Sequence, residues 1–311
     1  MHIGIQGIGT YVPKKRVHLK QLANTLQLSD SDLDLLLHTH QLSKIAIEDE
    51  KNAEEMLVTA IENLLLYEDI NPDEVGLILF TNTILQFSPF LSDPFLHIKE
   101  KFGFCNAQSM SISNLNCSGM DFLFSVSHKW LSNNPNEKSV LLLTSDKTFV
   151  EDFRYLKKSS VMGDAASAIL ISKSAKENKI IESQINVDAT IFNGEASSPK
   201  EFDWFLKSVS TGIIKNFRAL LKRTNMNIND ISLIMASNVN VPTWNNIGKI
   251  LKIPIEKIYF PTLKEVGHAH NSDPILNLQY ALRKKKLSKG DYFVTLTAGI
   301  GGTFGCTLFQ H

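Results

Sequence analysis

The strongest constraint on the fold is an internal repeat. Residues 71–82 (NPDEVGLILFTN) align without a gap with residues 227–238 (NINDISLIMASN), at an offset of 238 − 82 = 156 residues. In both copies a polar turn leads into a run of apolar residues, which is typical of a strand buried on both faces of a parallel sheet. The repeat predicts a chain made of two α/β halves, each with a sheet covered by helices.

The connection between the halves is expected where the composition changes. Residues 173–179 are mostly polar or charged, and the pattern of apolar stretches starts again after them. We therefore assign residues 1–172 to an N-terminal half and residues 173–311 to a C-terminal half. With 311 residues, of which 43% are hydrophobic, the chain is long and apolar enough to bury a large core.

Charge and cysteine content narrow the classes of function. The chain has 32 basic and 32 acidic residues, so no net charge favours a nucleic acid partner. No apolar run reaches the roughly 18 residues of a membrane span, and the first residues alternate like a strand rather than a leader peptide. Cys105, Cys117 and Cys306 are too few and too scattered for a disulfide framework or a metal site. The sequence thus predicts a cytoplasmic protein with no membrane span and no metal.

Cys117 occupies a position suited to a nucleophile. Residues 107–112 alternate like a short strand, and apolar residues recur at helical spacing from Phe122 to Trp130. Cys117 is therefore predicted between a strand and a helix, where free backbone N–H groups and the positive helix end stabilise a thiolate and an oxyanion. The alternative is an inert core cysteine, since cysteine is among the most buried residue types.

The repeat brings a second segment towards Cys117. The offset of 156 places Cys117 opposite Asp273, because 117 + 156 = 273, and Pro274 is favoured at the first position of a helix. Equivalent helix starts of two halves related by a pseudo-two-fold axis lie close together, so residues 267–273 should share a pocket with Cys117. This expected convergence favours the nucleophile over the inert cysteine.

The loop 267–273 contains a base and an orienting acceptor. A cysteine nucleophile needs a base, and the base needs an acceptor for its other ring nitrogen; His268 and Asp273 can fill these roles. Two alternatives remain. Asp273 is also a good N-cap for the following helix, and His270 lies only two residues from His268. We favour His268 as the base because Gly267 permits close backbone approach just before it.

Two further segments are candidates for the pocket. Residues 299–305 (GIGGTFG) form either a tight turn or a turn that supplies an oxyanion donor near Gly301. Residues 87–104 contain two prolines and many aromatic residues, and they either line an apolar acyl cavity or pack in the core. For both segments the sequence leaves the two interpretations open.

Four motifs spread along the chain carry a resemblance to a known family. They are residues 7–13 (GIGTYVP), 117–119 (CSG), 162–166 (MGDAA) and 299–305 (GIGGTFG). In this order they resemble the thiolase superfamily, and within it the β-ketoacyl-acyl-carrier-protein synthase III family. The resemblance implies a five-layered αβαβα fold and a homodimer. It also implies that Cys117 takes an acyl group from coenzyme A or an acyl carrier protein, with no permanently bound cofactor.

The chain departs from that family's pattern in one respect. Family members use a histidine and an asparagine beside the cysteine, but residues 237–240 (SNVN), where the histidine is expected, contain none. His268 stands where the family's asparagine follows a glycine, so asparagine and histidine are exchanged. Gly267-His268 with Asp273 five residues later resembles a minority branch that transfers acyl groups through a nucleophile-His-Asp triad.

We therefore predict an acyltransferase of fatty-acid-like or secondary-metabolite biosynthesis. Cys117 takes the acyl group, His268 deprotonates the acceptor and Asp273 orients His268. The N–H of Cys117 and one near Gly301 hold the oxyanion, and Asn238 is a hydrogen-bonding side chain of the pocket. Two alternatives are a decarboxylative condensing enzyme that uses Asn238 and His268 as an exchanged pair, and a non-catalytic partner of an active paralogue.

Overall fold

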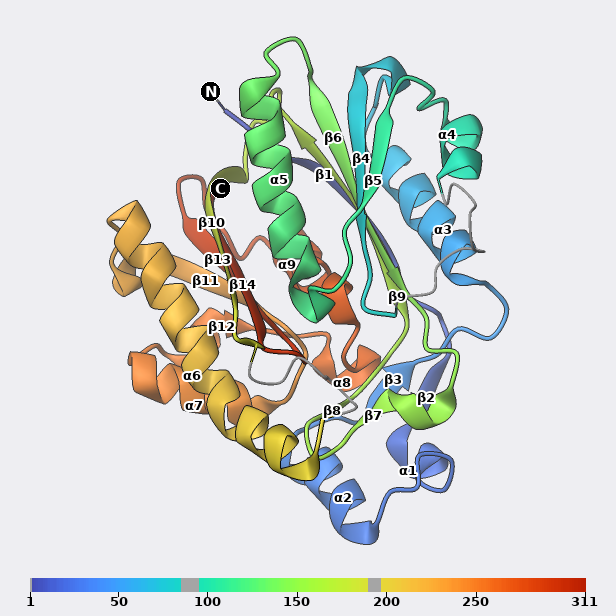
Figure 1. Ribbon diagram of the computed structural model, residues 1–311, viewed down its shortest axis with the longest axis vertical. Helices are drawn as coiled ribbons and strands as arrows, with labels where there is room; N and C mark the ends of the chain where they lie inside the picture. Colours follow the sequence, from blue (N-terminus) through green and yellow to red (C-terminus); the bar gives the residue numbers. More distant parts are fainter. Residues whose placement is uncertain (1, 85–94, 190–196) are drawn as a thin grey trace.

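The computed structural model describes residues 2–84, 95–189 and 197–311, and its main feature is one large mixed sheet (Figure 1). The strand order is β12-β11-β13-β14-β10-β1-β9-β6-β4-β5. The strands are β1 (Gly4–Tyr11), β4 (Val75–Thr81), β5 (Gln108–Ser111), β6 (Ser139–Asp146), β9 (Ala165–Ser172), β10 (Lys179–Val187), β11 (Ile231–Ala236), β12 (Ile258–Tyr259), β13 (Tyr292–Gly299) and β14 (Thr303–Gln310). The two halves of the sheet join where Gly4 pairs with Lys179.

The long helices form three layers that alternate with the two halves of the sheet (Figure 1). On one outer side lie α3 (Ala53–Leu65) and α4 (Leu96–Phe102), and on the other lie α6 (Pro199–Thr224) and α7 (Val241–Leu251). Between the half-sheets lie α5 (Gly119–Asn133) and α9 (Asp273–Arg283). The predicted five-layered αβαβα fold is confirmed. Within the described residues, no helix combines the length and the apolar character that crossing a membrane requires.

Three clusters of buried apolar side chains hold these layers together. The central cluster joins α5 and α9 to both half-sheets through residues such as Phe124, Ile275 and Phe309. A second cluster packs α3 against β4, β6 and β9, and a third packs α6 and α7 against β11, β13 and β14. Because α5 and α9 are buried on several sides, the residues at their starts are held in the interior of the molecule.

A group of short elements lies beside the ends of α5 and α9. They are β2 (Arg16–His18), β3 (Lys44–Ala46), β7 (Tyr155–Leu156), β8 (Ser160–Val161), α1 (Leu19–Leu22), α2 (Asp30–Asp34) and α8 (Leu263–Val266). An apolar cluster that includes Leu19, Ile45, Val161 and Leu263 packs them together. This cluster fixes α8, and with it the start of the loop 267–273.

The strand order repeats between the two halves. One half reads β1-β9-β6-β4-β5, and the other reads β10-β14-β13-β11-β12. The aligned strands β4 and β11 begin at Val75 and Ile231, which are 231 − 75 = 156 residues apart, as predicted. The division at residues 172 and 173 falls in the connection between β9 and β10, and it stays a proposal.

The predicted pairing of Cys117 with Asp273 is wrong by two residues. The equivalent helices α5 and α9 begin at Gly119 and Asp273, which are 273 − 119 = 154 residues apart. The connections that precede the two helices therefore differ in length by two residues. With this offset, 117 + 154 = 271, so Cys117 corresponds to Asn271.

Candidate active site

Cys117 lies in the short turn that leads into α5. The turn is a 3₁₀ helix, Asn116–Ser118, and α5 follows it directly. Asn114 and Asn116 have left-handed backbones, with φ of 67° and 51°, a conformation that asparagine adopts more readily than most residues. Cys117 is 5% exposed. It lies where the first N–H groups of the helix have no partner within the helix, as the sequence predicts.

His268 is held in place by its backbone. Its N–H donates to the carbonyl of Val161 and its own carbonyl accepts from Gly163, both at 2.9 Å. The preceding Gly267 has φ 76°, and a Cβ there would lie 2.6 Å from a side-chain carbon of Ile45. Only glycine fits such a position without strain. The motif 162–166 is therefore more than a hairpin turn, because it anchors the loop that carries His268.

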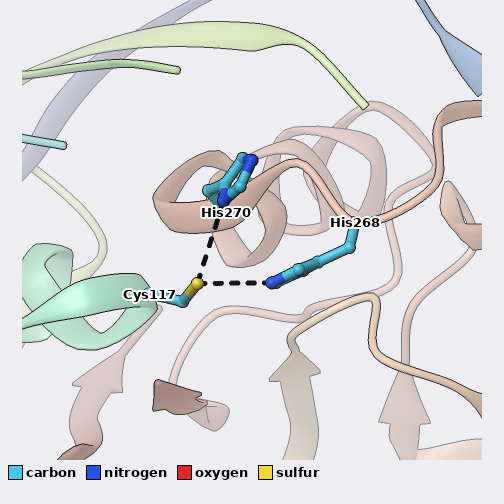
Figure 2. Close-up of side chains that lie close together, drawn as sticks. All are labelled: Cys117, His268 and His270. Carbon is cyan, nitrogen blue, oxygen red and sulfur yellow. Dashed lines mark hydrogen bonds between the residues drawn. The ribbon is translucent and has the colours of Figure 1, made fainter. Parts of the chain in front are cut away.

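Cys117, His268 and Asp273 form one chain of close contacts. Sγ of Cys117 lies 3.3 Å from Nε2 of His268 (Figure 2), and Nδ1 of His268 lies 2.5 Å from Oδ2 of Asp273. All three side chains are buried. The expected meeting of a sulfur from the first half with an imidazole from the second is observed.

The carboxylate of Asp273 orients His268 and does not cap the helix. Oδ2 accepts the N–H of Asn238 and Oδ1 accepts the N–H of Ala269, both at 2.7 Å. Ser272 occupies the N-cap position of α9, and Asp273 is the first residue of the helix. Two backbone donors therefore fix the carboxylate on the side of His268, where it holds the ring nitrogen that faces away from the sulfur.

The side chain of Asn238 does not lie where the sequence predicts it. Its Nδ2 donates to Oγ1 of Thr262 at 2.8 Å and to the carbonyl of Gly267 at 3.1 Å. Its Oδ1 accepts from Asn277 at 3.1 Å, and Asn238 is absent from the lining of the cavity described below. The expected role as a pocket side chain is wrong because the amide is used to hold the loop. The backbone of Asn238 serves the site through Asp273.

Burial and charge shift the pKa values of the two neighbouring histidines in opposite directions. Burial lowers the pKa of His268, but the negative charges of Asp273 and Cys117 outweigh it and raise that pKa well above its usual value. Burial, together with the positive charges of His268 and Arg154, lowers the pKa of His270 well below its usual value. At neutral pH His268 therefore carries a proton charge, and His270 is neutral.

His270 lies beside the same sulfur. Its Nδ1 is 4.0 Å from Sγ of Cys117 (Figure 2), and the two imidazole rings are 5.3 Å apart, centre to centre. His270 is fully buried, its φ is 54°, and its Nε2 has no hydrogen-bond partner among the residues that the structure describes. The geometry favours His268 as the base, because His268 is closer to the sulfur and is oriented by Asp273.

A cavity of about 220 Å³ opens onto Cys117 and His268. Its walls are mostly apolar and come largely from α6, α7 and the segment before β8. The apolar lining residues are Leu156, Met162, Phe205, Leu206, Val209, Ile213, Val239, Pro242, Trp244, Ala298 and Ile300. Such a cavity suits an apolar substrate group that reaches the sulfur.

The aromatic segment 87–104 contributes to the core where it can be seen. Residues 87–94 lie outside the described residues. Phe95 and Phe104 are buried in the cluster that packs α3 against the sheet, and they do not line the cavity. For the described part of this segment, the core is therefore the correct interpretation.

The glycine-rich turn 299–302 lies next to the nucleophile. Gly301 and Gly302 have φ of 99° and 74°. A Cβ on Gly299 would lie 3.0 Å from the backbone nitrogen of Cys117. The turn thus brings backbone without side chains against the N–H of Cys117. The role of Gly301 as the source of an oxyanion donor stays a prediction.

Asn271 is a residue of the site that sequence reasoning missed. Its Nδ2 donates to Oγ1 of Thr83 at 3.1 Å and to the carbonyl of Asn116 at 3.0 Å, and its Oδ1 accepts the N–H of Met120 at 3.2 Å. One amide thereby links the start of α9 to the start of α5. The offset of 154 residues, which places Asn271 opposite Cys117, is the signal that points to it.

Thr83 and Asp146 support the other side of the sulfur. Oγ1 of Thr83 lies 3.6 Å from Sγ of Cys117, and the N–H of Thr83 donates to Asp146 at 2.7 Å. Burial raises the pKa of Asp146 to about 6, although the N–H groups of Ile84 and Thr83 act in the opposite direction. Asp146 holds the residues that follow β4 against the nucleophile.

Comparison with known proteins agrees with this site. Residues 221–311 match the family described as 3-oxoacyl-[acyl-carrier-protein (ACP)] synthase III C terminal. The beta-ketoacyl-[acyl-carrier-protein] synthase III of Wolbachia pipientis subsp. Culex pipiens (strain wPip) is 23% identical over 99% of this chain and 98% of the relative. The chain belongs to the β-ketoacyl-acyl-carrier-protein synthase III family of the thiolase superfamily.

Solved structures show the same fold as this synthase III family chain at low sequence identity. ChlB3, named an acyltransferase, has a TM-score of 0.88 and 17% identity, and the match covers 100% of this chain and 98% of ChlB3. The 3-oxoacyl-[acyl-carrier-protein] synthase III from Aquifex aeolicus VF5 has a TM-score of 0.84 and 19% identity over 99% of this chain and 100% of that chain. The shared fold extends over both halves.

Proposed function

We propose that this synthase III family member is an acyltransferase that forms an acyl-enzyme at Cys117. The observation that carries the proposal is the buried chain from Sγ of Cys117 through His268 to Asp273, with contacts of 3.3 and 2.5 Å. Acyl transfer to a hydroxyl or an amine requires a nucleophile, a base and an oriented base, and these three groups supply them. ChlB3, which has the same fold, is named an acyltransferase.

In the loading step, Sγ of Cys117 attacks the carbonyl carbon of an acyl thioester. The oxyanion forms next to the N–H of Cys117 and the turn 299–302, which supply hydrogen-bond donors. When the tetrahedral intermediate collapses, the bond to the donor sulfur breaks. The protonated His268 gives its Nε2 proton to the leaving thiol, and the acyl group stays on Cys117.

Loading also prepares His268 for the transfer step. The sulfur of the acyl-enzyme is neutral, so one of the two negative charges that raise the pKa of His268 is gone. His268 has given up its proton, and Asp273 keeps Nε2 directed at the cavity by holding Nδ1. His268 can therefore accept the proton of an incoming hydroxyl or amine as that group attacks the acyl carbon.

The donor in this proposal is an acyl thioester of coenzyme A or of an acyl carrier protein, and no permanently bound cofactor takes part. The mostly apolar cavity beside Cys117 suits the acyl chain. We also propose that the protein is a cytoplasmic homodimer in fatty-acid-like or secondary-metabolite biosynthesis. A non-catalytic partner of an active paralogue would have no need of the three aligned groups.

Decarboxylative condensation is the second candidate, because the Wolbachia relative that matches nearly the whole chain is named a β-ketoacyl synthase. This reaction needs two donors to hold an enolate oxygen, and the sequence offered Asn238 as one of them. The amide of Asn238 is instead hydrogen-bonded to Thr262, Gly267 and Asn277. This placement favours acyl transfer over condensation.

Acyl-enzyme prepared with a series of acyl-coenzyme A thioesters separates the candidates. The transfer proposal expects the acyl group to leave Cys117 for alcohols or amines, and malonyl thioester to release no carbon dioxide above a Cys117→Ala control. Carbon dioxide release at the rate of acyl turnover would replace transfer by condensation. If no chain length gives an adduct on Cys117, while Cys105→Ala behaves as wild type, the non-catalytic partner is favoured.

A further inference from the structure

We propose that Cys117, His268 and His270 bind one Zn²⁺ ion, and that bound zinc blocks the acylation of Cys117. The sulfur of Cys117 and one ring nitrogen of each histidine lie within 4.8 Å of one another. Thiolate and imidazole are the ligands that zinc prefers in proteins. The block of acylation rests on the proposed function, whereas zinc binding does not. The proposal revises the sequence prediction that the chain has no metal site.

The distances between these atoms are close to those of a tetrahedral zinc site. Bonds of about 2.3 Å to sulfur and about 2.0 Å to nitrogen place the two ligand atoms about 3.5 Å apart. Sγ of Cys117 is 3.3 Å from Nε2 of His268 and 4.0 Å from Nδ1 of His270. Movements of roughly half an ångström, within the reach of side-chain rotation, bring both nitrogens to that spacing.

Asp273 prepares His268 to act as a metal ligand. Histidines that bind metals usually donate their other ring N–H to a carboxylate, which fixes the tautomer and the direction of the ligating nitrogen. Oδ2 of Asp273 lies 2.5 Å from Nδ1 of His268, and this contact leaves Nε2 directed at the sulfur. The first ligand pair is therefore already aligned (Figure 2).

His270 is the residue that turns this pair into a metal site. Burying an imidazole with an unpaired nitrogen costs free energy, as does a left-handed backbone at a residue other than glycine. His270 carries both costs: its Nε2 has no hydrogen-bond partner within the described chain, and its φ is 54°. Acyl transfer does not require His270, and a third zinc ligand gives the ring a role.

The fourth coordination position faces the cavity. Cys117 and His268 line the cavity, whereas His270 does not. An ion held by the three side chains lies at the inner end of the cavity, where water can complete a tetrahedral site with three protein ligands. Because zinc occupies the sulfur lone pair that attacks the thioester, the ion and the acyl donor compete for the same position.

Competition with a chromophoric zinc chelator measures binding to the intact protein without any acyl substrate. The wild-type chain is expected to bind one zinc ion per chain, and His270→Asn is expected to weaken binding about 100-fold. His38→Asn, the same change at an exposed histidine, should bind zinc as the wild type does. Equal zinc affinity of His270→Asn and wild type, or no zinc binding by wild type, would overturn the proposal.

A second variant guards against a folding defect in His270→Asn. Asp273→Asn leaves the three ligands in place and is expected to weaken zinc binding about 10- to 100-fold, because it removes the partner of His268. Cobalt(II) in place of zinc should give the visible absorption of a tetrahedral site and a thiolate charge-transfer band. A band that persists in Cys117→Ala would contradict the proposed ligand set.

Alkylation of Cys117 by iodoacetamide tests the block directly. One equivalent of zinc should protect Cys117 in the wild type but not in His270→Asn, and magnesium should protect neither, because magnesium prefers oxygen ligands. Alkylation at an unchanged rate in zinc-loaded wild type would overturn the block. If acyl transfer itself fails, the chelator and alkylation results still stand, since neither uses an acyl group.

Discussion

The starts of α5 and α9 are equivalent positions in the two halves, and they carry different chemistry. The start of α5 supplies a sulfur and free N–H groups beside Gly299. The start of α9 supplies two imidazoles and the carboxylate of Asp273. Neither half holds a complete site. The repeated fold therefore provides one shared pocket, and the residues at its two equivalent corners provide complementary groups.

Two buried carboxyl groups sharpen this comparison. Asp121, in the first turn of α5, accepts hydroxyl hydrogens from Thr295, Thr297 and Thr307 at 2.5 to 2.7 Å. Burial raises its pKa to about 6, although the three hydroxyls act against the shift. Asp121 ties α5 to the opposite half-sheet, whereas Asp273 faces an imidazole. The same residue type near equivalent helix starts thus serves structure in one half and the proposed chemistry in the other.

Removing the sulfur should have the largest effect. Cys117→Ala is expected to form no acyl adduct and to lower acyl transfer by at least about 10⁴-fold, because no other group at either helix start is a comparable nucleophile. Intact-mass measurement after exposure to acyl thioesters checks this. Cys105→Ala, at an exposed cysteine, is the matched control and should react as wild type. An adduct that persists in Cys117→Ala would place the nucleophile elsewhere.

Neutralising the carboxylate at the start of α9 should have the next largest effect. Asp273→Asn keeps the size of the side chain but removes a negative charge that raises the pKa of His268 and the acceptor that fixes its tautomer. Acyl transfer in a single turnover is expected to fall about 10²- to 10⁴-fold. A rate within threefold of wild type would show that His268 needs no orienting partner.

Breaking the link between the two helix starts should have a moderate effect. Asn271→Ala removes the hydrogen bonds to Asn116, Thr83 and Met120. Acylation is expected to slow about 10-fold as the two corners lose their registration. The free energy of unfolding in urea should fall by about 1–3 kcal/mol, because buried partners of Asn271 lose their hydrogen bonds. Unchanged acylation would mean that packing alone aligns the helix starts.

Asp121→Asn should have the smallest effect on acyl transfer, leaving the rate within a few-fold of wild type. Its effect lies in the pH dependence of stability. The pKa of Asp121 rises from 3.8 to about 6 on folding, so the folded chain binds more protons than the unfolded chain between these values. Ionisation of Asp121 therefore lowers the free energy of unfolding as pH rises through this window, by about 3 kcal/mol at most.

Urea unfolding from pH 4 to pH 6.5 checks this sign. Wild type should lose stability relative to Asp121→Asn as pH rises, and the difference between the two should level off above about pH 6. Parallel curves for the two proteins would contradict the assignment of this slope to Asp121.

The sequence predicted the parts of the site that depend on pattern. The repeat, the strand-to-helix position of Cys117 and the offset between the halves were enough to bring Cys117 and the loop 267–273 together. Gly267 before His268 correctly indicated a close backbone approach, since a Cβ there would lie 2.6 Å from Ile45. The resemblance supplied the five-layered arrangement, which periodicity alone does not determine.

The features that sequence reasoning missed depend on side-chain direction and on loop length. Asn238 was expected in the pocket, but residues distant in sequence, Thr262 and Asn277, draw its amide away. The two-residue difference between the loops hid the link made by Asn271. Residues from α6 line the cavity because this helix crosses the sheet near Cys117, and no local pattern in 199–224 indicates that contact.

The most direct test of the account is the rate and position of acylation in wild type and in His268→Asn. We expect peptide mapping after exposure to acyl-coenzyme A to find the acyl group on Cys117. We expect His268→Asn to acquire it about 10²- to 10⁴-fold more slowly. An unmodified Cys117 with every chain length, or acylation of His268→Asn at the wild-type rate, would contradict the claim that the two halves supply one nucleophile and its base.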